Sequence, residues 1–322
     1  MKIKILLTSI LCSLFLFANA QKVGDAKDDV KVLESKDPNG WNKVGSIGLD
    51  LAQLWLINPR AGAGDNRFGF GGGITYLASY KDTNAIWTNQ FGAQLAVVSV
   101  AGGPFTKATD AIQFTSKAGR KISSKWYFGG LFDFQTQLLN TYGSNYLSKT
   151  PEGVDPTIVK GLSLTSAFFS PANIKFAPGF IYKHDAHLSV FLSPLALKAI
   201  IVADQNLANS GTFFPNPNKD KSIDFQLGFD IRFDYNNKFA NDKITYVGAF
   251  DLYSNYLREP QNMAVEFYHT LDFNIIKNLS IVLKSDWFYD HNQLVFIDGN
   301  PNTPGRRMFF RNALNLAYKY SF

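Results

Sequence analysis

The stretch Ile223–Tyr235 (IDFQLGFDIRFDY) alternates strictly between two kinds of side chain. Its odd-numbered residues are all apolar, and its even-numbered residues are all polar or glycine. Successive side chains of a β-strand point to opposite faces, so a period of two indicates a strand with one apolar and one polar face. The stretch therefore predicts a strand that separates an apolar from a polar environment.

The same period of two recurs along most of the chain. We expect twelve strands, at residues 45–56, 67–80, 85–100, 110–120, 125–138, 172–183, 188–202, 223–235, 243–256, 263–275, 279–290 and 307–322. A tilted membrane-spanning strand needs roughly 9–11 residues. Short and longer connections alternate between these segments, which is typical of outer-membrane proteins. The sequence therefore predicts an all-β fold, a transmembrane antiparallel β-barrel of about twelve strands with short periplasmic turns and longer extracellular loops.

The composition agrees with a fold that faces lipid. Of the 322 residues, 46% are hydrophobic and 15% aromatic, but only 18% are charged, below the roughly 25% of an average soluble protein. Such a chain is too apolar to be disordered, and its single cysteine, Cys12, excludes a disulfide scaffold. The net charge is +6 and no basic run is present, so a nucleic-acid partner is not indicated.

Residues 1–20 have the organisation of a secretory signal peptide. Lys2 and Lys4 provide the positive start, an apolar stretch follows, and Ala18-Asn19-Ala20 is a small-x-small cleavage site. The alternatives are a buried helix or membrane anchor, and a lipoprotein acceptor at Cys12. The chain then divides into a signal peptide at 1–20, a periplasmic N-terminal tail at 21–44 and an outer-membrane β-barrel at 45–322.

Alternation alone does not show which face is buried. The apolar face points inward in a soluble barrel and toward lipid in a membrane barrel. Here the apolar faces carry almost no charge away from the strand ends, with Lys198 as the clearest exception, and aromatic residues gather toward the ends. These features favour a barrel in the cell outer membrane, in contact with its lipids. A secreted soluble β-protein is the alternative.

The last predicted strand ends on an aromatic residue. Its alternating apolar positions resemble the C-terminal assembly signal of Gram-negative outer-membrane barrels, which implies the barrel-assembly machinery as a partner. The residues of this candidate signal are Leu314, Leu316, Tyr318, Tyr320 and Phe322.

Several stretches resemble a Gram-negative outer-membrane β-barrel family that is catalogued as a domain of unknown function. They are Trp41–Asp50 (WNKVGSIGLD), Thr115–Gly119 with Lys125-Trp126-Tyr127, Val190–Leu195 (VFLSPL), Val202–Gly211 (VADQNLANSG) and Tyr253–Asn262 (YSNYLREPQN). The chain departs from the family at Ile57–Gly64 and at Leu197. The resemblance implies location and fold, and it brings no activity, cofactor or catalytic residue.

The polar faces of the strands would line the barrel interior. Candidate lumen-lining residues are Lys117, Asp133, Asp224, Asp230, Arg232, Asp251, Glu266, Asp272, Lys284 and Asp286. Lys175, Lys183 and Asp234 fall on the same faces. Two hypotheses remain open: a narrow channel or binding barrel for a small polar solute, and a structural or interaction barrel whose lumen is blocked by salt bridges. The loop 139–171 is long enough to fold inward and constrict the interior.

Catalysis and metal binding are the weaker hypotheses. His269, Ser254 and Ser285 fall on apolar faces of neighbouring strands, as in an outer-membrane lipase, but nucleophilic catalysis needs a serine, a base and an orienting group within hydrogen-bond reach. No dense constellation of this kind is present in the sequence. His184 and His187 flank a turn around Asp185, where a solvated turn is a simpler interpretation than a metal site. We therefore expect no enzyme activity, no metal and no cofactor.

Overall fold

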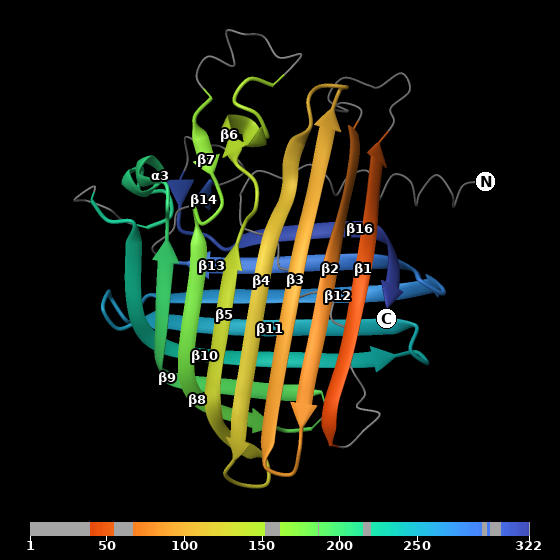
Figure 1. Cartoon of the computed structure of the whole chain (residues 1–322), viewed down its shortest axis with the longest axis vertical. Coiled ribbons are helices and arrows are strands. Elements are labelled where there is room, and N and C mark those ends of the chain that lie inside the picture. Colours follow the sequence, from red (N-terminus) through yellow and green to blue (C-terminus); the bar gives the residue numbers. More distant parts are fainter. Residues whose placement is uncertain are drawn as a thin grey trace.

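Twelve antiparallel strands form a closed ring in the computed structural model of this chain (Figure 1). The structure describes residues 39–54, 67–151, 162–185, 187–214, 220–291, 295–296 and 304–321. Around the ring the order is β1-β16-β13-β12-β11-β10-β9-β8-β5-β4-β3-β2. The barrel strands are β1 (Gly40–Leu54), β2 (Arg67–Lys81), β3 (Ala85–Val100), β4 (Thr106–Lys121), β5 (Trp126–Thr136), β8 (Ala172–Lys183), β9 (Leu188–Ile201), β10 (Ile223–Phe239), β11 (Ile244–Asn255), β12 (Met263–Ile276), β13 (Leu279–Asp290) and β16 (Phe309–Ser321).

The first and last strands close the ring. β1 pairs with β16 in antiparallel register, with Ile47 opposite Tyr320 and Leu49 opposite Tyr318. Closure leaves no free sheet edge, which is the condition for a sheet that spans lipid. The predicted fold class is confirmed.

The apolar side of the strands faces outward. Phe225 on β10 is 70% exposed and Leu49 on β1 is 65% exposed, whereas Asp230 on β10 is fully buried. On β16, Leu316, Tyr318 and Tyr320 are exposed on the same outer face. The side chain of Leu314 and the whole of Phe322 lie outside the described residues.

Short and long connections lie at opposite ends of the barrel. At the short-turn end, which includes the turns 82–84 and 277–278, the connections have two to four residues, and Gly40 pairs with Lys81 there. At the long-loop end they range from 101–105 to 137–171. Small elements decorate this end: β6 (Thr141–Tyr142), η2 (Gly143–Asn145), β7 (Leu164–Ser166), α3 (Gln205–Asn209), β14 (Val295–Phe296) and β15 (Pro304–Gly305).

The described part of the longest loop continues the barrel wall. In Figure 1, β6 and β7 stand beyond the ends of β5 and β8. The amide of Gln137 donates to the carbonyls of Ala167 and Ser170, and the carboxylate of Asp110 accepts the backbone N–H groups of residues 138 and 139. Residues 152–161 of this loop are outside the described part, so the inward folding considered for 139–171 stays a prediction.

Two strand boundaries differ from the sequence prediction. β1 begins at Gly40, so residues 40–44 belong to the barrel and not to the predicted tail at 21–44. Trp41 explains the extension, because its ring packs against Tyr80 on β2 and Trp87 on β3. β10 continues to Phe239. The predicted signal peptide and residues 21–38 lie outside the described residues. Among the described residues, no helix is long and apolar enough to cross a membrane.

The expectation that Lys198 faces lipid is wrong. Ser193 pairs with Asp230 and Ala196 pairs with Gly228, so β9 has one extra residue in this interval. A β-bulge of this kind reverses which face the following residues occupy. Leu197 is therefore exposed, and the Lys198 ammonium lies 5.3 Å from the ring centroid of Tyr253, a buried residue.

Candidate functional site

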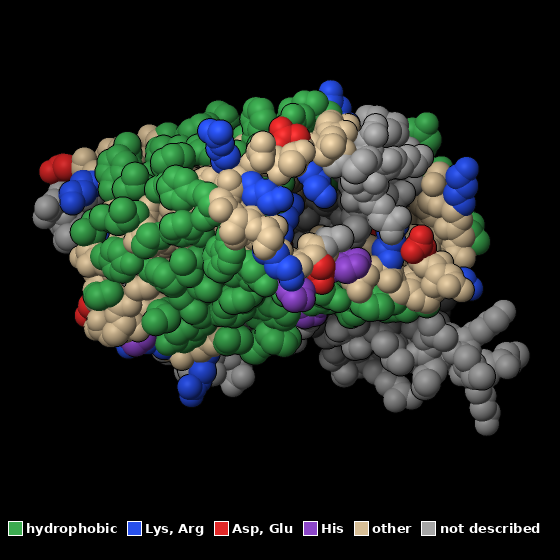
Figure 2. All heavy atoms as spheres, turned by 90° about the horizontal axis from the view of Figure 1, so that it is seen from below, with side chains coloured by type: hydrophobic (Ala, Val, Ile, Leu, Met, Phe, Trp, Pro, Cys, Tyr) green, Lys and Arg blue, Asp and Glu red, His purple; other side chains and the backbone are tan. Residues whose placement is uncertain are grey.

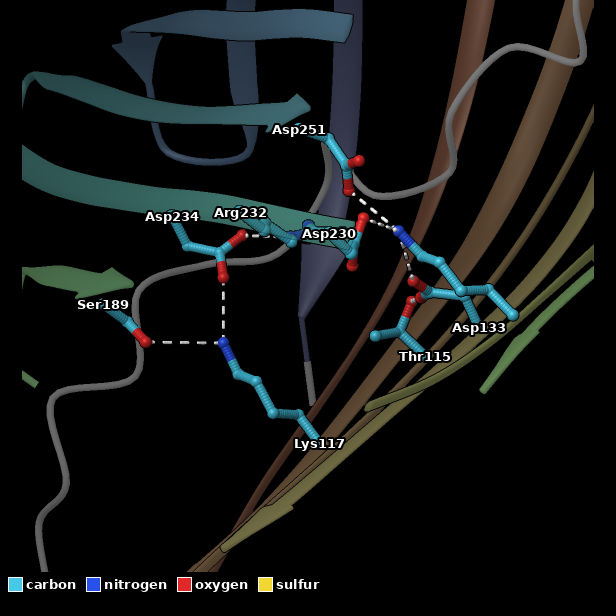
Figure 3. Close-up of polar contacts among 9 residues, drawn as sticks. Thr115, Lys117, Asp133, Ser189, Asp230, Arg232, Asp234 and Asp251 are labelled. Carbon is cyan, nitrogen blue, oxygen red and sulfur yellow. Dashed lines mark hydrogen bonds and ion pairs between the residues drawn. The ribbon is translucent and has the colours of Figure 1, made fainter. Parts of the chain in front are cut away.

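Lys175 on β8 forms the centre of a charged cluster inside the barrel. Its ammonium nitrogen lies 3.0 Å from a carboxylate oxygen of Asp230 on β10 and 3.0 Å from one of Asp251 on β11. Asp133 on β5 is 4.0 Å away and also accepts the hydroxyl of Thr115 at 2.6 Å. Figure 3 shows the three carboxylates converging on one amino group.

These contacts cross the interior, as the strand order requires. β9 and β10 stand between β8 and β11 in the ring, so a direct contact between Lys175 and Asp251 cannot run along the wall. The side chains of Lys175, Asp230 and Asp251 are at most 14% exposed. We name Lys175, Asp133, Asp230 and Asp251 the central cluster.

A second set of contacts runs from β4 to β10. The Lys117 ammonium lies 2.8 Å from Asp234 and 3.5 Å from the Ser189 hydroxyl oxygen. Arg232 donates its Nε–H to the other oxygen of Asp234 at 2.7 Å. Three strands, β5, β8 and β9, lie between β4 and β10 in the ring, so this contact also spans the interior (Figure 3).

Apolar side chains fill the interior next to these charges. All members of this apolar layer are less than 9% exposed, and they come from β3, β5, β8, β9 and β11. They are Ile86, Tyr127, Leu131, Ala177, Ile181, Phe191, Ala196 and Tyr253. The layer leaves little space, because a Cβ at Gly119 would lie 2.9 Å from Ile181 Cδ1 and 3.0 Å from Tyr127 Cβ.

The structure brings together half of the ten candidate lumen residues. Five join the contacts around Lys175 and Asp234: Lys117, Asp133, Asp230, Arg232 and Asp251. In the sequence, Lys175 and Asp234 also fall on the inward-facing positions of their strands. Their central position depends on which non-neighbouring strands meet across the barrel, and alternation carries no such information.

The other five candidates are Asp224, Glu266, Asp272, Lys284 and Asp286. Asp224 lies at the long-loop end, where Arg258 donates to both of its carboxylate oxygens. On the backbone, Glu266 pairs with Asp251 and Phe288, Asp272 pairs with Thr245 and Val282, and Lys284 pairs with Thr270 and Ala313. The side chain of Asp286 is outside the described part. The lumen-lining role of these residues stays a prediction.

The outward-facing serines considered for catalysis have other partners. Ser254 donates its hydroxyl to the carbonyl of Pro260, and Ser285 accepts the indole N–H of Trp287 at 2.9 Å. His269 lies opposite Ser285 in the register and packs against the rings of Phe267 and Trp287.

The carboxylate of Asp185 holds the turn between β8 and β9 through hydrogen bonds to the backbone. The Asp185 carboxylate accepts the backbone N–H groups of Leu188 and His187 at 2.8 and 2.7 Å. These two hydrogen bonds lower the pKa of Asp185, the first being the larger cause. The described residues contain no group of three or more His, Cys, Asp or Glu side chains placed to hold a metal ion.

The closed ring, its apolar outer face and its charged interior define the class of this protein as a transmembrane β-barrel. A family model described as "Protein of unknown function (DUF3078)" matches residues 52–142. This match confirms the resemblance to a family of unknown function. No curated protein matches the chain in sequence.

Solved outer-membrane structures are similar to this chain at low identity. One is the translocator domain of the autotransporter NalP from Neisseria meningitidis, with 9% identity, a TM-score of 0.37 and coverage of 98% of this chain and 96% of that chain. An outer-membrane channel from Pseudomonas putida F1 has 12% identity, a TM-score of 0.37 and coverage of 90% and 100%. The NanC porin has 11% identity, a TM-score of 0.36 and coverage of 86% and 97%. Scores of this size transfer no function to this chain.

Proposed function

We propose that this protein is an outer-membrane β-barrel whose lumen is closed at its centre in the resting state. It then acts as a gated or solute-binding barrel and not as an open diffusion pore. The outer-membrane location is supported by the apolar outer face, with exposed residues such as Phe70, Phe128 and Phe225, and by the signal peptide predicted at residues 1–20.

The contact between Lys175 and Asp251 carries this proposal. It joins two strands that are not neighbours in the ring, and the apolar layer packs beside it. Water and ions that enter from the long-loop end would have to displace Lys175 from its carboxylates. A buried ion pair resists such a change, because removal of one partner leaves the other charge uncompensated.

A second candidate is a narrow permanent passage along the wall formed by β1, β2 and β3. The interior side of this wall carries small uncharged polar groups: the hydroxyls of Ser46 and Thr75 are bonded at 2.5 Å, and those of Ser79 and Thr88 at 3.3 Å. Such a lining suits a small polar solute. Twelve strands are fewer than the 16–18 of porins with an aqueous channel, so the passage would be narrow.

A liposome-swelling assay separates the two candidates. Vesicles that contain the refolded protein are diluted into isotonic solutions of glycerol, a pentose or a disaccharide, with empty vesicles and a 16-stranded porin as controls. A closed barrel predicts swelling at the rate of empty vesicles for all three solutes. Swelling for glycerol alone would favour the narrow passage, and swelling for all three would contradict a closed centre.

We further propose that the barrel has no hydrolase activity, because Ser254 donates its hydroxyl to a backbone carbonyl and Ser285 accepts from an indole. Hydrolysis of short-chain phospholipid in detergent is the test. Activity that the protein shows and that His269→Ala abolishes would overturn this proposal.

A further inference from the structure

We propose that Lys183, Lys117 and the hydroxyl of Ser189 form an anion-binding site inside the short-turn end of the barrel, suited to a phosphate group. This goes beyond the closed lumen, because the site lies toward one mouth and needs neither an open nor a shut centre. Figure 2 views the molecule from below, and Lys and Arg side chains gather there around a hollow in this face.

Lys183 belongs to the inward face of β8. It is the last residue of that strand and shares its phase with Ala177 and Ile181, which are fully buried. The intervening Tyr182 points outward and packs against Trp126, with ring centroids 4.9 Å apart. This outward contact fixes the phase of β8 at its end, so the half-buried side chain of Lys183 is directed to the interior.

Lys117 reaches the same place from β4. Its ammonium lies 3.5 Å from the Ser189 hydroxyl oxygen, and Ser189 is the register partner of Lys183. The serine that accepts from Lys117 is thus the backbone partner of Lys183. Among the described residues, the charged groups close enough to influence Lys183 are the like-charged Lys117 and Lys81 and the oppositely charged Asp234.

The acidic group here is already engaged. Asp234 pairs with Lys117 at 2.8 Å and with Arg232 at 2.7 Å. Among the described residues Lys183 makes no ion pair, and the nearby Asp82 is in a turn, where it accepts the N–H groups of Asn84 and Ala85. Lys117, Lys183 and the exposed Lys81 thus outnumber the Asp234 carboxylate, which Lys117 and Arg232 already engage. Half-buried positive charge in this excess favours a bound anion.

The chemistry of the donors favours a phosphate group. Lysine ammonium groups bind phosphate as point charges, and the Ser189 hydroxyl can donate a hydrogen bond to a phosphate oxygen. The central cluster further inside contains three carboxyl groups around the ammonium of Lys175, so it favours an anion less than the lysines at the short-turn end do. The site therefore holds the anion at the mouth. The phosphate can belong to a soluble phosphorylated solute or to the headgroup of a phospholipid.

Calorimetric titration of the refolded full-length chain tests the proposal. One arm adds pyrophosphate to protein in a non-ionic, phosphate-free detergent, and the other adds a short-chain phosphatidic acid below its micellar concentration. We expect saturable binding with one site per barrel in at least one arm. Binding of pyrophosphate identifies a soluble phosphate ligand, and binding of the lipid alone identifies a headgroup.

Matched variants make the result specific to this site. Lys183→Met should weaken binding at least about tenfold, equivalent to one lost charge contact, whereas Lys183→Arg should retain it. Lys243→Met removes an exposed lysine from a turn at the same end and should have no effect. The heat-modified gel mobility of each variant reports whether the barrel is folded. The absence of saturable binding in both arms, or equal binding by a folded Lys183→Met variant, would overturn the proposal.

Discussion

Lys175 on β8 and Asp251 on β11 lie 3.0 Å apart across the inside of the barrel, although β9 and β10 separate their strands along the wall. Asp230, which belongs to β10, binds the same ammonium through a carboxylate oxygen that is 3.0 Å from the nitrogen. The contact joins parts of the wall that the backbone hydrogen bonds leave apart, so it constrains the cross-section of the barrel as well as filling it. The proposed closure of the lumen depends on this relationship.

The bulge in β9 determines which of two adjacent residues, Leu197 or Lys198, faces the lipid. Leu197 faces outward and Lys198 inward. Leu197→Lys should therefore destabilise the barrel in lipid by roughly 2–4 kcal/mol if it lies near the midplane, whereas Lys198→Leu should not show the stabilisation expected from removing a lipid-facing charge. Urea titration of both variants in vesicles measures the difference. A stabilised Lys198→Leu variant with a neutral Leu197→Lys variant would mean that the bulge is misplaced.

Glycine at position 129 is required by the close approach of β4 and β5. A Cβ at Gly129 would lie 1.9 Å from the carbonyl oxygen of Ala118, and the backbone cannot retreat without breaking the strand pair. Gly129→Ala should lower the stability of the barrel by roughly 1–3 kcal/mol, measured by urea unfolding. Gly48→Ala is the matched control, because its Cβ would meet only the Tyr318 carbonyl oxygen at 4.0 Å. Equal stability of the two variants would count against the described pairing of β4 with β5.

The turn after β8 should weaken in acid. Hydrogen bonds from Leu188 and His187 lower the pKa of Asp185 in the folded state, so ionised Asp185 stabilises the turn above its ordinary pKa, and this stabilisation is lost as the pH falls through the lowered value. The protection factors of the His187 and Leu188 amides, measured by hydrogen exchange and NMR, should fall over that range. Asp185→Asn should remove most of this acid dependence. Protection factors that do not change with pH in the unmodified chain would show that the carboxylate does not hold the turn.

The sequence predicts the strands well because each strand is a local pattern. Alternation across Ile223–Tyr235 and its counterparts places all twelve strands, and it places their outer faces except after the bulge in β9. The prediction fails where a contact between residues far apart in the sequence determines the direction of a side chain or the end of a strand. The inward direction of Lys198 depends on the bulge opposite Gly228 and Asp230. The start of β1 at Gly40 depends on the packing of Trp41 on Tyr80.

The candidate site is only half predictable for the same reason. Period two places Lys175, Asp133, Asp230 and Asp251 on inward faces, so a charged interior is foreseeable. Their meeting at one ammonium depends on how β5, β8, β10 and β11 are offset and curved around the barrel, and no residue within one strand encodes that arrangement. Phe191 and Tyr127 fall on the inward phases of their strands, but their residue types do not show that they pack together in one apolar layer.

Single-channel conductance in a planar bilayer tests the closed centre most directly. The unmodified chain is compared with Lys175→Met, which leaves Asp133, Asp230 and Asp251 without their shared cation, and with Lys243→Met as an exposed control. We predict no steady current steps for the unmodified chain and for Lys243→Met, and cation-selective steps for Lys175→Met, because three carboxylates that have lost their shared ammonium take up water and cations. Steady steps of the same size in the unmodified chain and in Lys175→Met would contradict a lumen closed by the central cluster.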